Sequence, residues 1–137
     1  AFYRVYQTRD DRHIVLGGRE IKFARALLDA LDRPDLLPLA EAPAREQGAL
    51  IAFLDETFRT RTRDEWTAWF ADKDVAFAPV LDFREALDQP HMAERGLVRE
   101  APSGGRHIAP AIRFVGDDWQ PASVPLLTAA PCDPPAG

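Results

Sequence analysis

Cysteine is nearly absent from this sequence: Cys132 is the only one among 137 residues. A single thiol cannot form an intrachain disulfide or supply the cysteine pairs of common zinc sites. The three histidines, His13, His91 and His107, also lack the spacing of metal ligands. We therefore expect no disulfide framework, no metal site and no tightly bound cofactor.

Long apolar runs are missing as well. No stretch approaches the roughly 20 apolar residues that a membrane-spanning helix needs, and no charged segment followed by an apolar one opens the chain. The composition, 46% hydrophobic and 28% charged, is that of an ordinary globular domain. We expect a cytoplasmic protein that has no membrane partner.

Lysine is scarce, since Lys22 and Lys73 are the only two among 17 basic residues. The arginines are scattered and lie among acidic residues, and the net charge of −5 opposes the phosphate backbone of nucleic acids. Nucleic acid is therefore excluded as an expected partner. Neither a G-x-S-x-G nor a P-loop pattern occurs, so the motifs do not indicate a hydrolase or a nucleoside triphosphatase.

The first part of the chain predicts a hairpin followed by helices. Residues 2–8 and 13–16 are rich in β-forming residues and flank a charged turn, which indicates two antiparallel strands. From Arg19 the apolar residues recur at helical spacing until Pro34 ends the pattern. A second helix is predicted after Pro43. Its apolar face comprises Leu50, Ile51, Leu54 and Phe58.

The start of a third helix has the clearest local signal. Thr62 and Glu65 have the spacing of a capping box, in which each side chain accepts a hydrogen bond from a free N–H of the first turn. Trp66, Trp69 and Phe70 follow at helical spacing. They fit a core-facing surface better than an exposed stacking platform for a nucleotide base.

The remaining pattern predicts short elements. We expect a buried strand at 75–81 with Pro79 at an edge or bulge, short helices at 83–87 and 91–95, Gly96 just beyond a helix end, and strands at 97–101 and 108–114. Because strands and helices do not alternate regularly, the predicted fold class is α+β: a small antiparallel sheet packed with several helices.

The end of the chain differs in character, because seven of the 12 prolines lie in the last 36 residues. We expect residues 1–101 to form the small domain and residues 102–137 to form a proline-rich segment that packs on a further domain. The chain also opens directly on a predicted strand without a methionine, as a domain excised from a longer polypeptide would.

Three collinear segments resemble the class III (CaiB/BaiF-type) CoA-transferase superfamily. The hairpin resembles its Y-x-T-x-D-G-R-x-x-x-x-G pattern, and residues 61–80 resemble R-T-x-D-E-W-x-x-x-F-x-x-x-D-V-x-x-A-P-V. Residues 91–96 resemble H-x-x-x-R-G. Each match is short, but together they cover about residues 2–98 in the family's order.

This resemblance implies a large Rossmann-like domain, a small α+β domain, and two protomers interlocked as a homodimer. Acyl-CoA then lies between the two domains, and the principal catalytic residues lie upstream of Ala1. The chain alone is expected to be inactive. Movement of CoA between carboxylic acids is the first expectation for the complete enzyme, because it is the family's commonest activity. Racemisation of a 2-methylacyl-CoA is the alternative.

Residues 17–23 resemble the racemase turn G-A-x-E-x-K/Q-F. The resemblance implies that Glu20 lies beside the active site and pairs with a catalytic histidine, and that Gly17 and Gly18 face acyl-CoA. Simpler roles also fit, since a glutamate is favourable at the positive end of a helix and glycines commonly terminate a strand.

A hypothesis from another class is a non-catalytic protein-binding module. In that case the hairpin, an exposed sheet edge and the proline-rich tail bind a protein partner. The tail and the missing catalytic acid support this hypothesis, although excision from a longer enzyme explains both.

Overall fold

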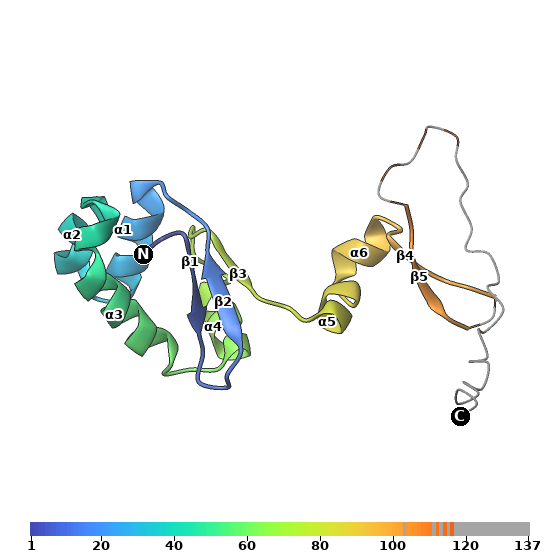
Figure 1. Cartoon of the computed structure of the whole chain (residues 1–137), viewed down its shortest axis with the longest axis horizontal. Coiled ribbons are helices and arrows are strands. Elements are labelled where there is room, and N and C mark those ends of the chain that lie inside the picture. Colours follow the sequence, from blue (N-terminus) through green and yellow to red (C-terminus); the bar gives the residue numbers. More distant parts are fainter. Residues whose placement is uncertain (103, 111, 113, 115, 117–137) are drawn as a thin grey trace, which may run out of the picture. The chain divides into compact units, whose positions relative to one another are not determined.

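The computed structural model describes residues 1–102, 104–110, 112, 114 and 116. The chain divides into two compact units, Ala1–Val80 and Leu81–Gly137, and each contains its own antiparallel sheet (Figure 1). Helices and small antiparallel sheets together confirm the predicted α+β class. The division expected at residue 101 concerns packing on a further domain and stays a prediction.

The first unit contains a three-stranded sheet in the order β1 (Arg4–Gln7), β2 (His13–Leu16), β3 (Phe77–Pro79). Both pairings are antiparallel, so the predicted hairpin is confirmed. Pro79 lies on an edge strand, as its missing N–H requires. The expectation of a buried strand here was wrong: β3 is short and only half-buried, because it borders a single neighbour.

Helices pack on one face of this sheet. They are α1 (Ile21–Ala30), α2 (Leu37–Glu41), α3 (Gly48–Phe58) and α4 (Arg63–Phe70), with 3₁₀ turns at Pro34–Leu36 and Ala44–Glu46. Helix α1 ends before Pro34, as predicted. The Arg33 N–H donates to the Leu28 carbonyl (2.8 Å) around Asp32, whose φ is +55°, and this closes the helix end. The sequence pattern did not predict α2.

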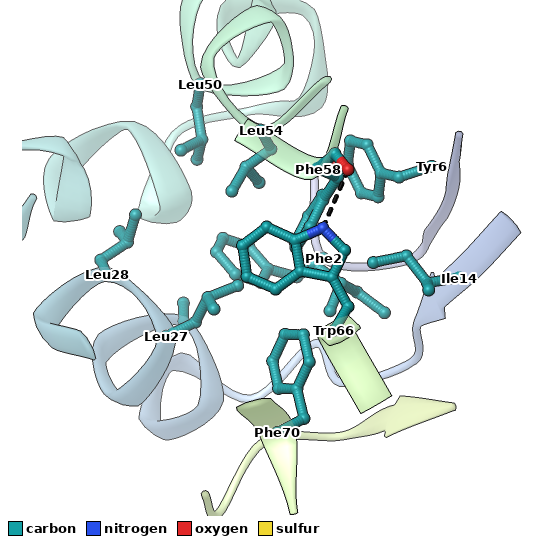
Figure 2. Close-up of a cluster of buried hydrophobic side chains, with 12 residues drawn as sticks. Phe2, Tyr6, Ile14, Leu27, Leu28, Leu50, Leu54, Phe58, Trp66 and Phe70 are labelled. Atoms are coloured by element: carbon teal, nitrogen blue, oxygen red, sulfur yellow. Dashed lines mark hydrogen bonds between the residues drawn. The ribbon is translucent and has the colours of Figure 1, made fainter. Parts of the chain in front are cut away.

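The core of the first unit is built from both sheet and helices (Figure 2). Phe58 lies at its centre, with ring centroids 5.0 Å from Tyr6 and 5.1 Å from Trp66. The Trp66 indole N–H donates to the Phe58 carbonyl at 2.9 Å, so the largest core side chain leaves no polar atom unpaired. Trp66 and Phe70 are buried and Trp69 is half-buried, which confirms the core-facing interpretation.

The second unit consists of short elements. They are α5 (Phe83–Leu87), α6 (Pro90–Glu94), β4 (Val98–Glu100) and β5 (Arg106–Ile108). Gly96 follows α6 with a φ of +59°, and the Gly96 and Leu97 N–H groups donate to Ala93 and Met92, which confirms the predicted helix end.

The expected strand at 108–114 was wrong, because β5 ends at Ile108. A five-residue loop closes the hairpin: the Ala101 N–H donates to the Gly105 carbonyl (2.7 Å), and Gly104 adopts a φ of +87°. This loop pairs Glu100 with Arg106 and starts the second strand early. Pro110 then lacks the N–H that a longer ladder would use.

Candidate functional site

The connection between β2 and α1 positions the residues that the sequence singled out. Gly17 extends the sheet by one residue, since its N–H donates to the Ala76 carbonyl at 2.8 Å. It is exposed, and a β-carbon at this position would meet no atom within 4 Å. Its backbone is also outside the left-handed region. No packing or conformational need within the described residues therefore explains a glycine here.

Gly18 has the opposite environment. It is buried, and a β-carbon would lie 2.4 Å from the Phe23 ring and 2.8 Å from Ala76. Its close contacts are with its own unit, so packing accounts for this glycine without a ligand. That acyl-CoA contacts either glycine stays a prediction.

Glu20 is the N-cap residue of α1, with φ −67° and ψ 130°. Its carbonyl accepts the first helical hydrogen bond from the Phe23 N–H (3.0 Å). Its exposed side chain makes no capping bond, and within the described part of the chain its carboxylate has no hydrogen-bond or ion-pair partner. The side chain is therefore available to a group outside this chain.

Two other helices start differently. Thr62 and Asp82 are N-caps with complete capping boxes, in which Glu65 and Glu85 accept from the N-cap N–H. This confirms the box predicted at Thr62. Serine, threonine, aspartate and asparagine are the favoured N-cap residues, and α1 has none of them at its start. Glutamate at position 20 is thus a less stabilising N-cap for α1 than any of these four residues would be.

A groove of about 590 Å³ lies next to the connection between β2 and α1. Arg19 and Ile21, the two neighbours of Glu20, line one side, and Phe2 and Gln47 line others. The Gln47 side-chain amide donates to the Ala42 carbonyl (2.8 Å), which holds the segment after α2 in place. Sequence reasoning missed this groove, because part of its wall comes from α2 and the turn that follows.

Other candidates have structural roles. The Arg61 guanidinium lies 4.8 Å from the Trp66 ring centroid, and the Lys73 ammonium lies 4.3 Å from that of Trp69. Trp66 is buried, and the Lys73 ammonium already covers a face of the half-buried Trp69 indole. Sequence reasoning also missed Arg63, a buried arginine that donates to the Val80 carbonyl at 3.2 Å.

The hairpin turn is tied to the start of α4. Asp10 accepts hydrogen bonds from the Thr8 hydroxyl (2.6 Å) and from the Arg63 backbone N–H (3.1 Å). The hydrogen bond from Thr8, with a smaller contribution from Arg63, holds the pKa of Asp10 below its usual range.

Among the described residues, no three histidine, cysteine, aspartate or glutamate side chains are grouped so that they could hold a metal ion. No helix in the same residues has the length and apolar character needed to cross a bilayer.

Solved structures share this fold. The chain superposes on the crystal structure of a hypothetical protein from Mycobacterium tuberculosis with a TM-score of 0.67 and 20% sequence identity. The match covers 82% of this chain and 32% of that one.

The chain also has relatives that are similar in sequence. The chain is 29% identical over 143 residues to a Mus musculus protein named α-methylacyl-CoA racemase, which covers 98% of this chain and 32% of the mouse protein. It is 33% identical over 85 residues to a Caenorhabditis elegans protein of the CaiB/baiF CoA-transferase family, which covers 61% of this chain and 23% of that protein. The chain thus spans about a third or less of the length of these relatives. The sequence pattern of CoA-transferase family III matches residues 1–132, and the chain therefore belongs to CoA-transferase family III, a family of enzymes.

Proposed function

We propose that this chain is part of a longer enzyme that inverts the α-carbon of 2-methylacyl-CoA thioesters. The carrying observation is Glu20, an exposed carboxylate at a helix start where it makes no capping bond. The racemase name of a relative that matches 98% of the chain supports the same activity. Acyl-CoA is the proposed substrate, the proposed assembly is an interlocked homodimer, and residues 102–137 pack on the further domain.

Inversion at an α-carbon requires a base that removes a proton and an acid that returns one to the opposite face. A carboxylate next to an imidazole stabilises the protonated ring and fixes its orientation. Glu20 supplies that carboxylate in our proposal, and the proton-transfer pair lies in the rest of the longer protein. The 137-residue chain alone is then inactive.

The second candidate is movement of CoA between two carboxylic acids. The family description and the Caenorhabditis elegans relative favour it. That reaction proceeds through a covalent carboxylate intermediate and depends on an acceptor acid. It leaves Glu20 without a chemical role, so the two candidates differ in what this residue does.

The test is an assay of the complete protein with 2-methylacyl-CoA in deuterated water. We expect deuterium to enter the α-position without any acceptor acid. Glu20→Gln should lower the rate at least about tenfold, whereas Glu56→Gln, an exposed glutamate on α3, should not. Acceptor-dependent CoA transfer without exchange would instead establish the second candidate.

Glu20→Ser separates catalysis from folding. Serine is a favoured N-cap, so the variant should raise the thermal midpoint of the protein while it loses proton exchange. A variant that loses both stability and exchange would show that Glu20 supports the helix rather than the reaction.

A further inference from the structure

The three-stranded sheet of the first unit has one face in the core and one face outside it. Tyr6, Ile14 and Leu16 point into the core and are at most 1% exposed. Because side chains alternate along a strand, their neighbours point the other way. We call this second surface the outer sheet face. Its residues within the strands are Val5, Gln7, His13, Val15 and Ala78, and Tyr3, Gly17 and Val80 continue the alternation at the strand ends.

The centre of the outer sheet face is apolar. Val5 pairs with Val15, and Val15 pairs with Ala78, so one row of aliphatic side chains crosses all three strands. Val5 is 51% exposed, and Ala78 is exposed as well. Tyr3 (78% exposed) and Val80 (40% exposed) extend the surface beyond the row. Apart from the half-buried Val15, these side chains lie open to solvent in the first unit.

The outer sheet face also lacks charge. None of its eight residues is Asp, Glu, Lys or Arg, although 28% of the sequence is charged. Antiparallel sheets that face water on one side normally alternate apolar residues inside with polar residues outside. Apart from the polar pair Gln7 and His13, this sheet instead has the composition of a sheet that is covered on both faces.

No element of the first unit provides that second cover. The core is formed by α1, α3 and α4 against the other face, and Figure 1 shows α1, α2 and α3 together on one side of the sheet. All 80 residues of this unit are described, so none of its helices remains to be placed on the outer sheet face.

We propose that the outer sheet face docks on the remainder of the longer protein, against an apolar surface free of charged side chains. The length of the relatives argues for this occupant, since the chain accounts for 32% of the mouse protein and about two thirds is left to cover it. Gly17 lies within this face and Glu20 follows three residues later. Docking through this face would therefore bring the candidate site against the rest of the enzyme. This inference rests on the proposed function in one respect, because both require a longer enzyme. It does not require that the enzyme be a racemase.

Thiol accessibility tests the proposal without an activity assay. In a Cys132→Ser background, Ala78→Cys places a thiol in the central row, and Val5→Cys provides a second probe should the first variant fold poorly. Ala52→Cys is the matched control, because Ala52 is an exposed alanine on α3, outside this face. Each variant is labelled with a maleimide, once in the 137-residue chain and once in the complete protein.

We expect the thiol introduced by Ala78→Cys to react about as fast as the Ala52→Cys control in the 137-residue chain, and at least about tenfold more slowly in the complete protein. The control should react alike in both. Equal reactivity of the Ala78→Cys thiol in both proteins would overturn the proposal. Protection already present in the 137-residue chain would also overturn it: a dependence on concentration would identify a second copy as the occupant, and independence would identify residues 81–137. Neither result depends on whether the enzyme is a racemase.

Discussion

The two units of this chain contain similar elements but differ in what holds them. The first unit buries a cluster that includes Leu27, Leu54, Phe58 and Trp66, whereas Ala101 and Ala109 are the only buried residues among the described part of the second. Phe83, Ile112 and Phe114 are exposed large side chains of the second unit. Both units have a capping box and a hairpin, so the difference between them lies in apolar burial.

Caps and turns define elements in both units, whereas apolar burial differs between them. Each unit has a capping box and a hairpin with a five-residue loop. Such motifs contribute about 1 kcal/mol each, while a buried large side chain contributes several times more. We therefore expect the first unit to be the more stable of the two, since the described residues of the second bury few apolar side chains.

The largest effect is expected from a core truncation. Phe58→Ala should lower the free energy of unfolding by about 3–5 kcal/mol, because it leaves a cavity among Tyr6, Trp66 and Phe70. Phe83→Ala, at a side chain that is 70% exposed, should change it by less than about 0.5 kcal/mol. Urea unfolding followed by tryptophan fluorescence measures both. Similar losses would remove the contrast between the units.

The two capping boxes allow a matched comparison. Thr62→Ala should lower the unfolding free energy of the first unit by about 1 kcal/mol, since the cap of α4 is lost. Asp82→Ala removes the same motif from α5, but we expect only faster local amide exchange in residues 83–87. Hydrogen exchange of both variants tests this. Global destabilisation by Asp82→Ala would show that the second unit is cooperative with the first.

A smaller effect on stability is expected from a substitution in a hairpin loop. The fourth residue of each five-residue loop has a positive φ: Asp11 at +57° and Gly104 at +87°. Asp11→Gly should stabilise the first unit by about 0.5–1 kcal/mol, since glycine adopts this conformation without steric cost. Thermal unfolding measures the gain. The opposing loss is the Gln7–Asp11 hydrogen bond (2.9 Å), and a net destabilisation would mean that this bond dominates.

The smallest expected effect is on the stability of the protein at acidic pH. The pKa of Asp10 is lowered in the folded protein, so its contribution to stability is present above its usual value of 3.8 and is lost as pH falls through the lower folded value. Asp10→Asn should therefore flatten the decline in unfolding free energy below about pH 4. Thr8→Val removes the hydroxyl donor and should act in the same direction. An unchanged acid limb in both variants would contradict this role.

Local signals in the sequence predicted much of the first unit. Thr62 and Glu65 specify their capping box within four residues, and α1 ends before Pro34, as the pattern predicted. The start of β5 could not be predicted in this way, because it depends on the loop at Ala101–Gly105 rather than on β-forming residues. Sequence reasoning missed buried Arg63 for a similar reason, because the Val80 carbonyl to which it donates is distant in sequence.

The candidate site was partly predictable. Resemblance to a family pattern indicated Glu20, and the phenylalanine at position 23 already shows that no capping box can form there. The different environments of Gly17 and Gly18 had no sequence signal, because they depend on the position of Ala76 across the sheet. The groove beside Arg19 likewise needed the folded chain.

The hydrogen bonds of Val80 also determine how this part of the chain responds to tension. The Val80 N–H donates to His13 at 2.9 Å and the Val80 carbonyl accepts from Arg63, so the last residue of the first unit is fastened at both polar groups. Tension on the chain beyond this point loads these two bonds first, one to β2 and one to α4. Leu81 alone separates this anchor from the Asp82 cap of α5. Leu81 is therefore the position where a spacer could lengthen the connection and leave the sheet under no added strain.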